Sequence, residues 1–281
     1  MRFSLLTLNL HTWQEADQLE KLDRVAQFVV EENITCLCLQ ECAQSREAEE
    51  LDEALRADNA GHLIRERLER YGLKYSMTWE CSHYGFERYE EGSAVLSQLP
   101  FLGSCSQYVS ETDDREIVQS RKVVMARLAV GPNTVIDVYS VHLSPPGAGF
   151  ETQVDSLVGF VASTPDLLEQ MKPPRPKRRG PPRKRAAPQP SPIATRLVCL
   201  AGDFNETPEG GIGALGGHGY LEASAGARET QPGTGTTRDG RWIDYVFVKP
   251  ALRPQSTSIV FHGGDRPPVS DHYGLVVEFE V

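Results

Sequence analysis

The residues of this chain best suited to chemistry follow short apolar stretches of the sequence. Glu41, Asp203, Asp244 and Asp271 all have this placement. Burying a carboxylate without a partner costs roughly several kcal/mol, so four such acids that converge on one edge need a cation. Hard oxygen ligands of this kind suit Mg²⁺ or Mn²⁺. The sequence therefore predicts a divalent-metal site.

Two histidines and two asparagines occupy comparable positions, at Asn9, His142, Asn205 and His272. Taken one at a time, these acids, asparagines and histidines usually have structural roles. Such a residue can be a turn residue, a helix cap, a partner in a surface ion pair or a hydrogen-bonded core histidine. Histidines on the same edge as the carboxylates instead favour phosphate contact or proton transfer. The combination, rather than any one residue, points to catalysis.

The elements that must position these residues are mostly strands. Strands are expected at residues 3–10, 34–40, 73–80, 93–97, 122–130, 134–143, 196–202, 242–248, 256–261 and 275–281. Helices are expected at 14–31 and 152–171, with one or two more in the leucine-spaced polar stretch at 51–68. A turn signal at 131–133 predicts a hairpin. This pattern favours one α/β domain of two packed sheets with helices outside.

The composition limits the class of protein. With 40% hydrophobic and 24% charged residues, the 281-residue chain is ordinary for a soluble globular protein. Its formal charge of -10 opposes general binding to a phosphate backbone. No apolar run approaches the roughly 20 residues of a membrane span, and no signal-peptide pattern follows Met1. Six scattered cysteines form no CxxC motif, so we expect a reduced, cytoplasmic protein.

Residues 172–185 (KPPRPKRRGPPRKR) stand apart, with eight basic residues, five prolines and no acidic residue. This composition cannot bury a core, so a basic, Pro-rich, disordered insertion is expected at about 172–195. It is interpreted as a solvated insertion, although it could bind an anionic partner such as nucleic acid.

Residues 211–216 satisfy GxGxxG, but they do not join a strand to a helix in a βαβ unit, so no dinucleotide site is expected.

Seven segments resemble the endonuclease/exonuclease/phosphatase superfamily, which includes pancreatic deoxyribonuclease, abasic-site endonucleases, neutral sphingomyelinases and inositol-polyphosphate phosphatases. They are TLNLHTW (7–13), CLQE (38–41), YEEGSAVLS (89–97), YSVHLSP (139–145), AGDFNETP (201–208), RWIDYVFV (241–248) and VSDHYGL (269–275). The resemblance implies a DNase I-like, four-layer α/β sandwich of two mixed β-sheets flanked by helices, as a single domain over 1–281. It also implies a divalent-metal phosphohydrolase.

The resemblance further implies roles for the carboxylates and asparagines. Glu41 would be the principal metal ligand, with Asn9 and Asp271 close to the same metal site or a second one. Asp203 would position or deprotonate the attacking water, and we take it as the general base. Asn205 would fix that water or a phosphoryl oxygen.

The histidines and their neighbours receive roles in the same way. His272 would face the phosphate and be oriented by Asp244. His142 would be the second phosphate-contacting histidine, held by Glu91. Tyr89 would lie nearby, and Arg121 would add positive charge to the substrate oxygens, as the resemblance implies.

A narrower resemblance is carried by NLHTWQE (9–15), SHYGFERYEEG (82–92) and FHGGDRPPVSDHYGLVVEFE (261–280). These segments look like the bacterial cytoplasmic branch that includes the maltose 6'-phosphate phosphatases. After the histidine motif, where that branch usually carries tryptophans, this chain has PPGAG at 145–149.

We therefore expect a magnesium-dependent phosphatase of carbohydrate metabolism that acts on a small phosphomonoester such as a sugar phosphate. A phosphodiesterase acting on nucleic acid or sphingomyelin is the alternative. A non-catalytic binding module is a third possibility, against which the intact set of site residues argues. The sequence leaves the oligomeric state open.

Overall fold

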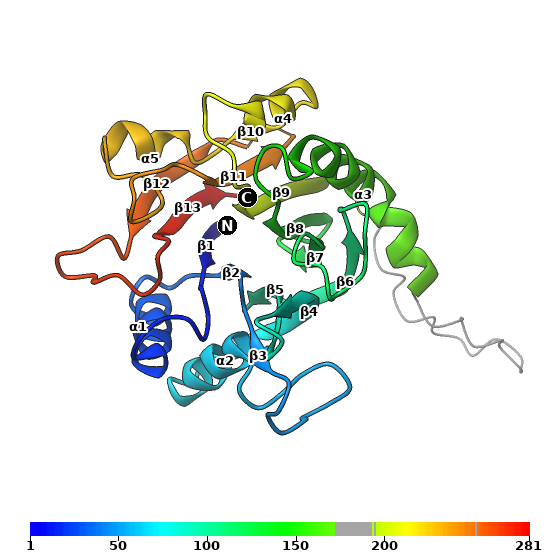
Figure 1. The fold of residues 1–281 in the computed structure, drawn as a ribbon. Helices are drawn as coiled ribbons and strands as arrows, with labels where there is room; N and C mark the ends of the chain where they lie inside the picture. Colours follow the sequence, from blue (N-terminus) through cyan, green and yellow to red (C-terminus); the bar gives the residue numbers. More distant parts are fainter. Residues whose placement is uncertain (172–192, 194, 251) are drawn as a thin grey trace, which may run out of the picture.

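Two mixed β-sheets packed face to face form the centre of the molecule (Figure 1). The computed structural model describes residues 1–171, 193, 195–250 and 252–281. The basic insertion expected at about 172–195 lies almost entirely outside the described residues. The predicted α/β sandwich of two mixed sheets flanked by helices is confirmed.

The first sheet contains the N-terminal and C-terminal strands of the chain. Its order is β12 (Pro254–Val260), β13 (Gly274–Glu280), β1 (Arg2–Asn9), β2 (Cys36–Gln40), β5 (Tyr89–Ser97) and β3 (Gln44–Ser45), and β4 (Ser76–Gly85) also pairs with β5. Strands β1 and β2 are parallel, and the other pairs are antiparallel. The carboxyl ends of β1 and β2 therefore lie at one edge.

The second sheet repeats this arrangement with different strands. Its order is β10 (Leu221–Glu222), β11 (Asp244–Lys249), β9 (Thr195–Asp203), β8 (Thr134–His142), β7 (Lys122–Ala129) and β6 (Phe101–Tyr108). Strands β8 and β9 are the parallel pair. The hairpin predicted at 131–133 is confirmed as the β7–β8 connection, with an antiparallel register.

Helices cover both outer faces of the sandwich (Figure 1). Helices α1 (Gln18–Glu31) and α2 (Ala60–Arg70) pack on the first sheet, and α3 (Phe150–Met171) packs on the second. Shorter elements follow β9, namely η1 (Gly211–Gly213), α4 (Ala214–Gly217) and α5 (Ala225–Thr230). Across the described ranges, no helix combines the length and the apolar character needed to cross a membrane.

The interior between the sheets changes from apolar to polar along the strands. Side chains alternate between the two faces of β1 and β2. Leu5 and Cys38 face the opposite sheet, whereas the next residue along each strand faces the helices. Further along, Gln40 donates a hydrogen bond across the interface to the Ser140 hydroxyl at 2.9 Å. Polar groups thus replace apolar ones toward the carboxyl ends of the strands, where the expected site residues lie.

Candidate active site

Strand register brings the candidate residues together at one edge of the sandwich. In the parallel pair β8–β9, His142 is the register partner of Asp203. Asp244 is the partner of Asp203 on the other side, where β11 begins. In the first sheet, Asn9 ends β1 beside the end of β2. Both parallel pairs therefore end at the same edge, as the sequence predicts.

The buried carboxylate of Asp203 is the point on which the side chains converge. Its Oδ2 accepts a hydrogen bond from Asn9 Nδ2 at 3.2 Å. The same oxygen lies 3.7 Å from Nε2 of His142 and 3.7 Å from Nε2 of His272. One oxygen atom is thus surrounded by three side chains from three different strands or loops.

The half-buried carboxylate of Glu41 and the buried carboxylate of Asp203 form a neighbouring pair. Asn9 Nδ2 bridges them, because it also donates to Glu41 Oε1 at 2.8 Å. Burial raises the pKa of Glu41 to about 7, and Glu91 and Asp203 add to the effect by charge repulsion. Burial likewise raises the pKa of Asp203 to about 6. Both anions would be stabilised by an additional positive charge.

A divalent cation fits this arrangement. The carboxylates of Glu41 and Asp203, with His142, place ligand atoms within 4.8 Å of one another. Asp203 also belongs to a second such group, with Asp244 and His272. Asp244 Oδ1 is buried and has no partner among the described residues. Oxygen-rich, negatively charged sets of this kind suit Mg²⁺ or Mn²⁺.

His272 and Asp244 form a close carboxylate–histidine pair. Nδ1 of His272 lies 2.9 Å from Asp244 Oδ2, and both side chains are buried. Burial alone would lower the pKa of His272, but Asp244 and Asp203 outweigh it and raise the pKa to about 10. The imidazole is therefore held as a cation that faces Asp203 through Nε2.

His142 has a different environment from the one expected. Burial and the charge of Arg121 lower its pKa well below the ordinary value. Arg121 Nη1 lies 3.4 Å from His142 Nδ1, and a guanidinium can only donate. The expectation that Glu91 holds His142 is corrected, since Glu91 Oε1 lies 3.1 Å from Nε2 of His83. Arg121 thus occupies the side of His142 expected for Glu91.

Asn205 is tied to the end of β9. Its backbone N–H donates to Asp203 Oδ1 at 2.8 Å, and its amide donates to the Leu143 carbonyl at 2.9 Å. Asn205 and Glu41 both adopt left-handed backbone conformations, with φ of 54° and 43°. Such conformations are uncommon for residues with side chains and cluster at functional sites.

Asp271 lies at the more exposed rim of the site. Its carboxylate is 46% exposed, and Oδ1 lies 3.6 Å from His11 Nδ1. That nitrogen also lies 3.0 Å from Glu15 Oε1. Sequence reasoning did not select His11 or Glu15, although both fall in the NLHTWQE segment at a spacing of four residues. His83 was missed in the same way, within SHYGFERYEEG.

The remaining expected residue, Tyr89, is half-buried at the start of β5, where the Arg88 guanidinium lies 5.5 Å from its ring centroid.

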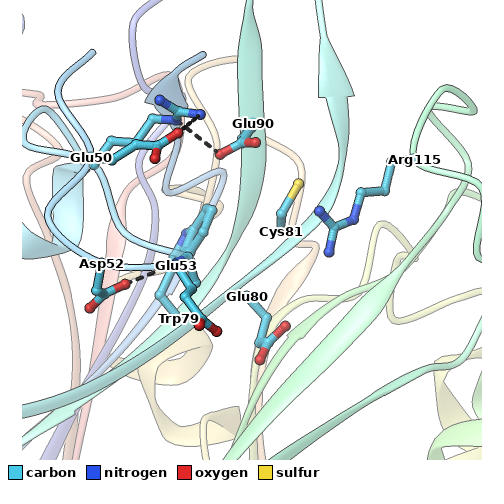
Figure 2. Close-up of a pocket in the computed structure, with 10 residues that line it drawn as sticks. Glu50, Asp52, Glu53, Trp79, Glu80, Cys81, Glu90 and Arg115 are labelled. Atoms are coloured by element: carbon cyan, nitrogen blue, oxygen red, sulfur yellow. Dashed lines mark hydrogen bonds and ion pairs between the residues drawn. The ribbon is translucent and has the colours of Figure 1, made fainter. Parts of the chain in front are cut away.

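A separate pocket of about 100 Å³ lies nearby, at the edge formed by β4 and β5 (Figure 2). None of the expected site residues lines it. Glu50 and Glu90 in this pocket face Arg56 at 3.1 Å and 3.6 Å. These acids therefore balance a neighbouring charge within the pocket.

Comparison with known proteins agrees with this geometry. A family model described as the Endonuclease/Exonuclease/phosphatase family matches residues 14–272. A search of curated proteins finds no match. A solved endonuclease/exonuclease/phosphatase family protein from Leptotrichia buccalis is 22% identical, with a TM-score of 0.80, over 99% of this chain and 100% of that chain.

Two further solved structures share the fold at lower identity. A functionally unknown conserved protein from Enterococcus faecalis is 16% identical, with a TM-score of 0.65, over 98% of both chains. D. rerio TDP2 complexed with single-strand DNA product is 13% identical, with a TM-score of 0.62, over 100% of this chain and 99% of that chain. At these identities the structural likeness supports the fold alone.

Proposed function

The chain belongs to the endonuclease/exonuclease/phosphatase family of phosphoester hydrolases, and on that basis we propose that it is a divalent-metal-dependent phosphatase for a small phosphomonoester such as a sugar phosphate. The observation that carries the proposal is the convergence of Asn9, His142 and His272 on the buried carboxylate of Asp203, beside Glu41. Acidic ligands and a cationic histidine together suit the hydrolysis of a phosphate ester.

The metal ligands would be Glu41, with Asn9 and Asp271 close by. A divalent cation bound at this edge would neutralise the non-bridging oxygens of the phosphate and lower the pKa of a bound water. In this structure the Asn9 amide turns its nitrogen to the two carboxylates, and its oxygen accepts from the His11 backbone N–H at 3.1 Å. Asn9 therefore fixes the distance between Glu41 and Asp203.

Asp203 would act as the general base. Its carboxylate is buried, and its raised pKa of about 6 lies close to neutral pH, where a base accepts a proton most effectively. His272 would stabilise negative charge on the phosphoryl group, because Asp244 keeps it protonated and fixes the ring. His142 would donate from Nε2 to a phosphoryl oxygen, since Arg121 occupies Nδ1.

A monoester substrate is supported by the sequence segments that resemble sugar-phosphate phosphatases and by the charge of -10, which opposes binding along a nucleic-acid strand. The phosphodiesterase alternative would use the same residues. The test is to incubate purified protein and Mg²⁺ or Mn²⁺ with sugar phosphates, nucleotides, plasmid DNA and sphingomyelin. Phosphate release from sugar phosphates, without DNA or lipid cleavage, is expected. Preferential cleavage of DNA or sphingomyelin would overturn the proposal.

A further inference from the structure

One side of the rim of the candidate site is built by a short antiparallel pairing of two loops. Thr237 forms a β-bridge with His272. The Arg238 backbone N–H donates to the Asp271 carbonyl at 2.9 Å. Because both contacts are made by the backbone, Arg238 is fixed directly beside Asp271 and His272.

Glu15 joins the side chain of Arg238 to that of His11. Arg238 Nη2 donates to Glu15 Oε2 at 3.1 Å, and His11 Nδ1 lies 3.0 Å from Glu15 Oε1. The same ring nitrogen lies 3.6 Å from Asp271 Oδ1. The His11 backbone N–H donates to Asn9 Oδ1 at 3.1 Å. His11 is therefore in direct contact with the amide that bridges the two carboxylates of the site.

We call His11, Arg238 and Asp271 the rim cluster. A ligand can reach all three side chains, which are 27%, 46% and 46% exposed, respectively. The contacts with Glu15 use one nitrogen of each donor, namely Nδ1 of the imidazole and Nη2 of the guanidinium. They leave His11 Nε2 and the other guanidinium N–H groups for a further partner.

A phosphate bound between His142 and His272 would place the group attached to it near the rim cluster. Both histidines and Asp203 are buried, so the attached group extends toward the exposed residues at the mouth of the site. Asp271 directly precedes His272, and Arg238 flanks it through the bridge between the two loops. The attached group therefore meets this side of the rim as it leaves the phosphate.

The rim cluster offers both donors and acceptors. The guanidinium of Arg238 only donates, the carboxylate of Asp271 only accepts, and an imidazole nitrogen such as His11 Nε2 can do either. The charges around the cluster are balanced, since two carboxylates, of Glu15 and Asp271, face two cations, of Lys21 and Arg238. A hydroxyl group donates and accepts without charge, so neighbouring hydroxyls match this set better than a second phosphate.

We propose that the rim cluster binds hydroxyl groups of the sugar attached to the phosphate, with Arg238 and His11 as contacting residues. Glu15 is the positioning residue that holds both side chains. This inference deepens the proposed phosphatase function and rests on it.

The test compares two substrates that share the phosphate and differ in the group attached to it. Steady-state kinetics with glucose 6-phosphate and with 4-nitrophenyl phosphate, whose ring bears no hydroxyl, give a ratio of kcat/KM values for each variant. Arg238→Ala removes a charged donor, so we expect this ratio to fall about tenfold, mainly through KM for the sugar phosphate. His11→Asn removes the ring but suits the left-handed backbone at this position, where φ is 47°, and should lower the ratio in the same direction.

Arg241→Ala is the matched control, because Arg241 lies in the same segment, is 55% exposed and donates to Asp239 rather than to Glu15. It should leave the ratio unchanged. Sugar-phosphate hydrolysis with an unchanged ratio in both rim variants would overturn the inference and leave the phosphatase function standing. A larger loss with fructose 1,6-bisphosphate than with glucose 6-phosphate would also overturn it, because the rim would then bind a second anion. Absence of hydrolysis of any of these compounds by the wild-type protein would overturn the phosphatase function, and the sugar-binding rim with it.

Discussion

The two histidines of the site differ in charge although both face Asp203 at 3.7 Å. The difference comes from the group behind each ring. Asp244 lies behind His272 and stabilises a cation, whereas Arg121 lies behind His142 and disfavours one. An anionic transition state would thus meet one charged donor and one neutral donor.

Replacing His272 and Asp244 by alanine tests whether they act as one unit. We expect each single change to reduce kcat by about 10²–10⁴-fold, since each removes the oriented cation. The double change should cost little more than either single change, because residues that act together are non-additive. The measurement is kcat for the four proteins of the cycle. Independent losses that multiply would show that Asp244 does not act through His272.

The sequence predicts which residues lie at this edge better than it predicts how they pair. Asn9, Asp203 and His142 could be placed because each ends a strand, and strand ends converge in a sheet. The partner of Glu91 could not be predicted, because it depends on an irregularity in β4 between Cys81 and His83. That shift places His83 opposite Glu91, and a bulge of this kind leaves no clear mark in the sequence.

Among the elements, the segment between β1 and α1 does the most to shape the rim of the site. His11, Trp13 and Asp17 have positive φ, so the helix expected from residue 14 begins only at Gln18. Glu15 anchors this segment, since its carboxylate contacts Lys21 of α1, His11, and Arg238 from the segment before β11. One carboxylate thereby connects three parts of the chain around Asp271.

Glu15→Gln should destabilise the protein in a pH-dependent way. Burial opposes ionisation, but Lys21, His11 and Arg238 lower the pKa of Glu15 from 4.5 to about 2. A depressed folded-state pKa stabilises the fold above the unfolded value, and this contribution is lost as the pH falls from 4.5 to 2. After allowance for solvent screening, we expect a loss of about 1–2 kcal/mol at pH 7.

Urea unfolding of the wild-type protein and Glu15→Gln at several pH values measures this effect. The difference in unfolding free energy should shrink as the pH approaches 2. A difference that stays constant from pH 7 to pH 3 would show that the charge of Glu15 does not stabilise the segment.

Other elements show where sequence patterns fail. Strand β6 was not predicted, because FLGSCSQY is a half-exposed edge strand without regular alternation. In the polar stretch at 51–68 a single helix forms, and it starts only at Ala60, where the Asn59 side chain accepts a hydrogen bond from the His62 N–H at 3.1 Å. Leu51 and Leu55 lie outside any helix, so their helical spacing was misleading.

At the scale of the whole molecule, the residues that flank the basic segment lie far from the candidate site. Thr195 donates to the Asn133 carbonyl at the β7–β8 turn, and it is the register partner of Thr134. From Thr134 to His142 the strand runs eight steps of about 3.3 Å, or roughly 26 Å. Met171 ends α3, and Leu168 on its last turn approaches the first residues of β6. Both flanks therefore lie toward the end of the sandwich opposite the site.

Replacing residues 172–185 with a short Gly/Ser linker should leave metal-dependent hydrolysis of a small phosphomonoester within a few-fold of the wild-type rate. The same change should weaken any salt-sensitive binding to DNA or anionic lipid, since eight positive charges are lost. Phosphate release and a salt titration of DNA binding measure the two effects. Loss of small-substrate turnover in a folded variant would favour the nucleic-acid alternative.

The most direct test of the account is the metal dependence of phosphate release in the wild-type protein and in Glu41→Gln. The protein is treated with chelator, Mg²⁺ or Mn²⁺ is titrated back, and phosphate release from a sugar phosphate is measured at each concentration. We predict that chelation abolishes wild-type activity and that the metal restores it. Glu41→Gln should stay folded but need far more metal or remain inactive, because a neutral amide binds these cations more weakly than a carboxylate. Activity that survives chelation, or a Glu41→Gln protein with wild-type turnover at limiting metal, would contradict the account.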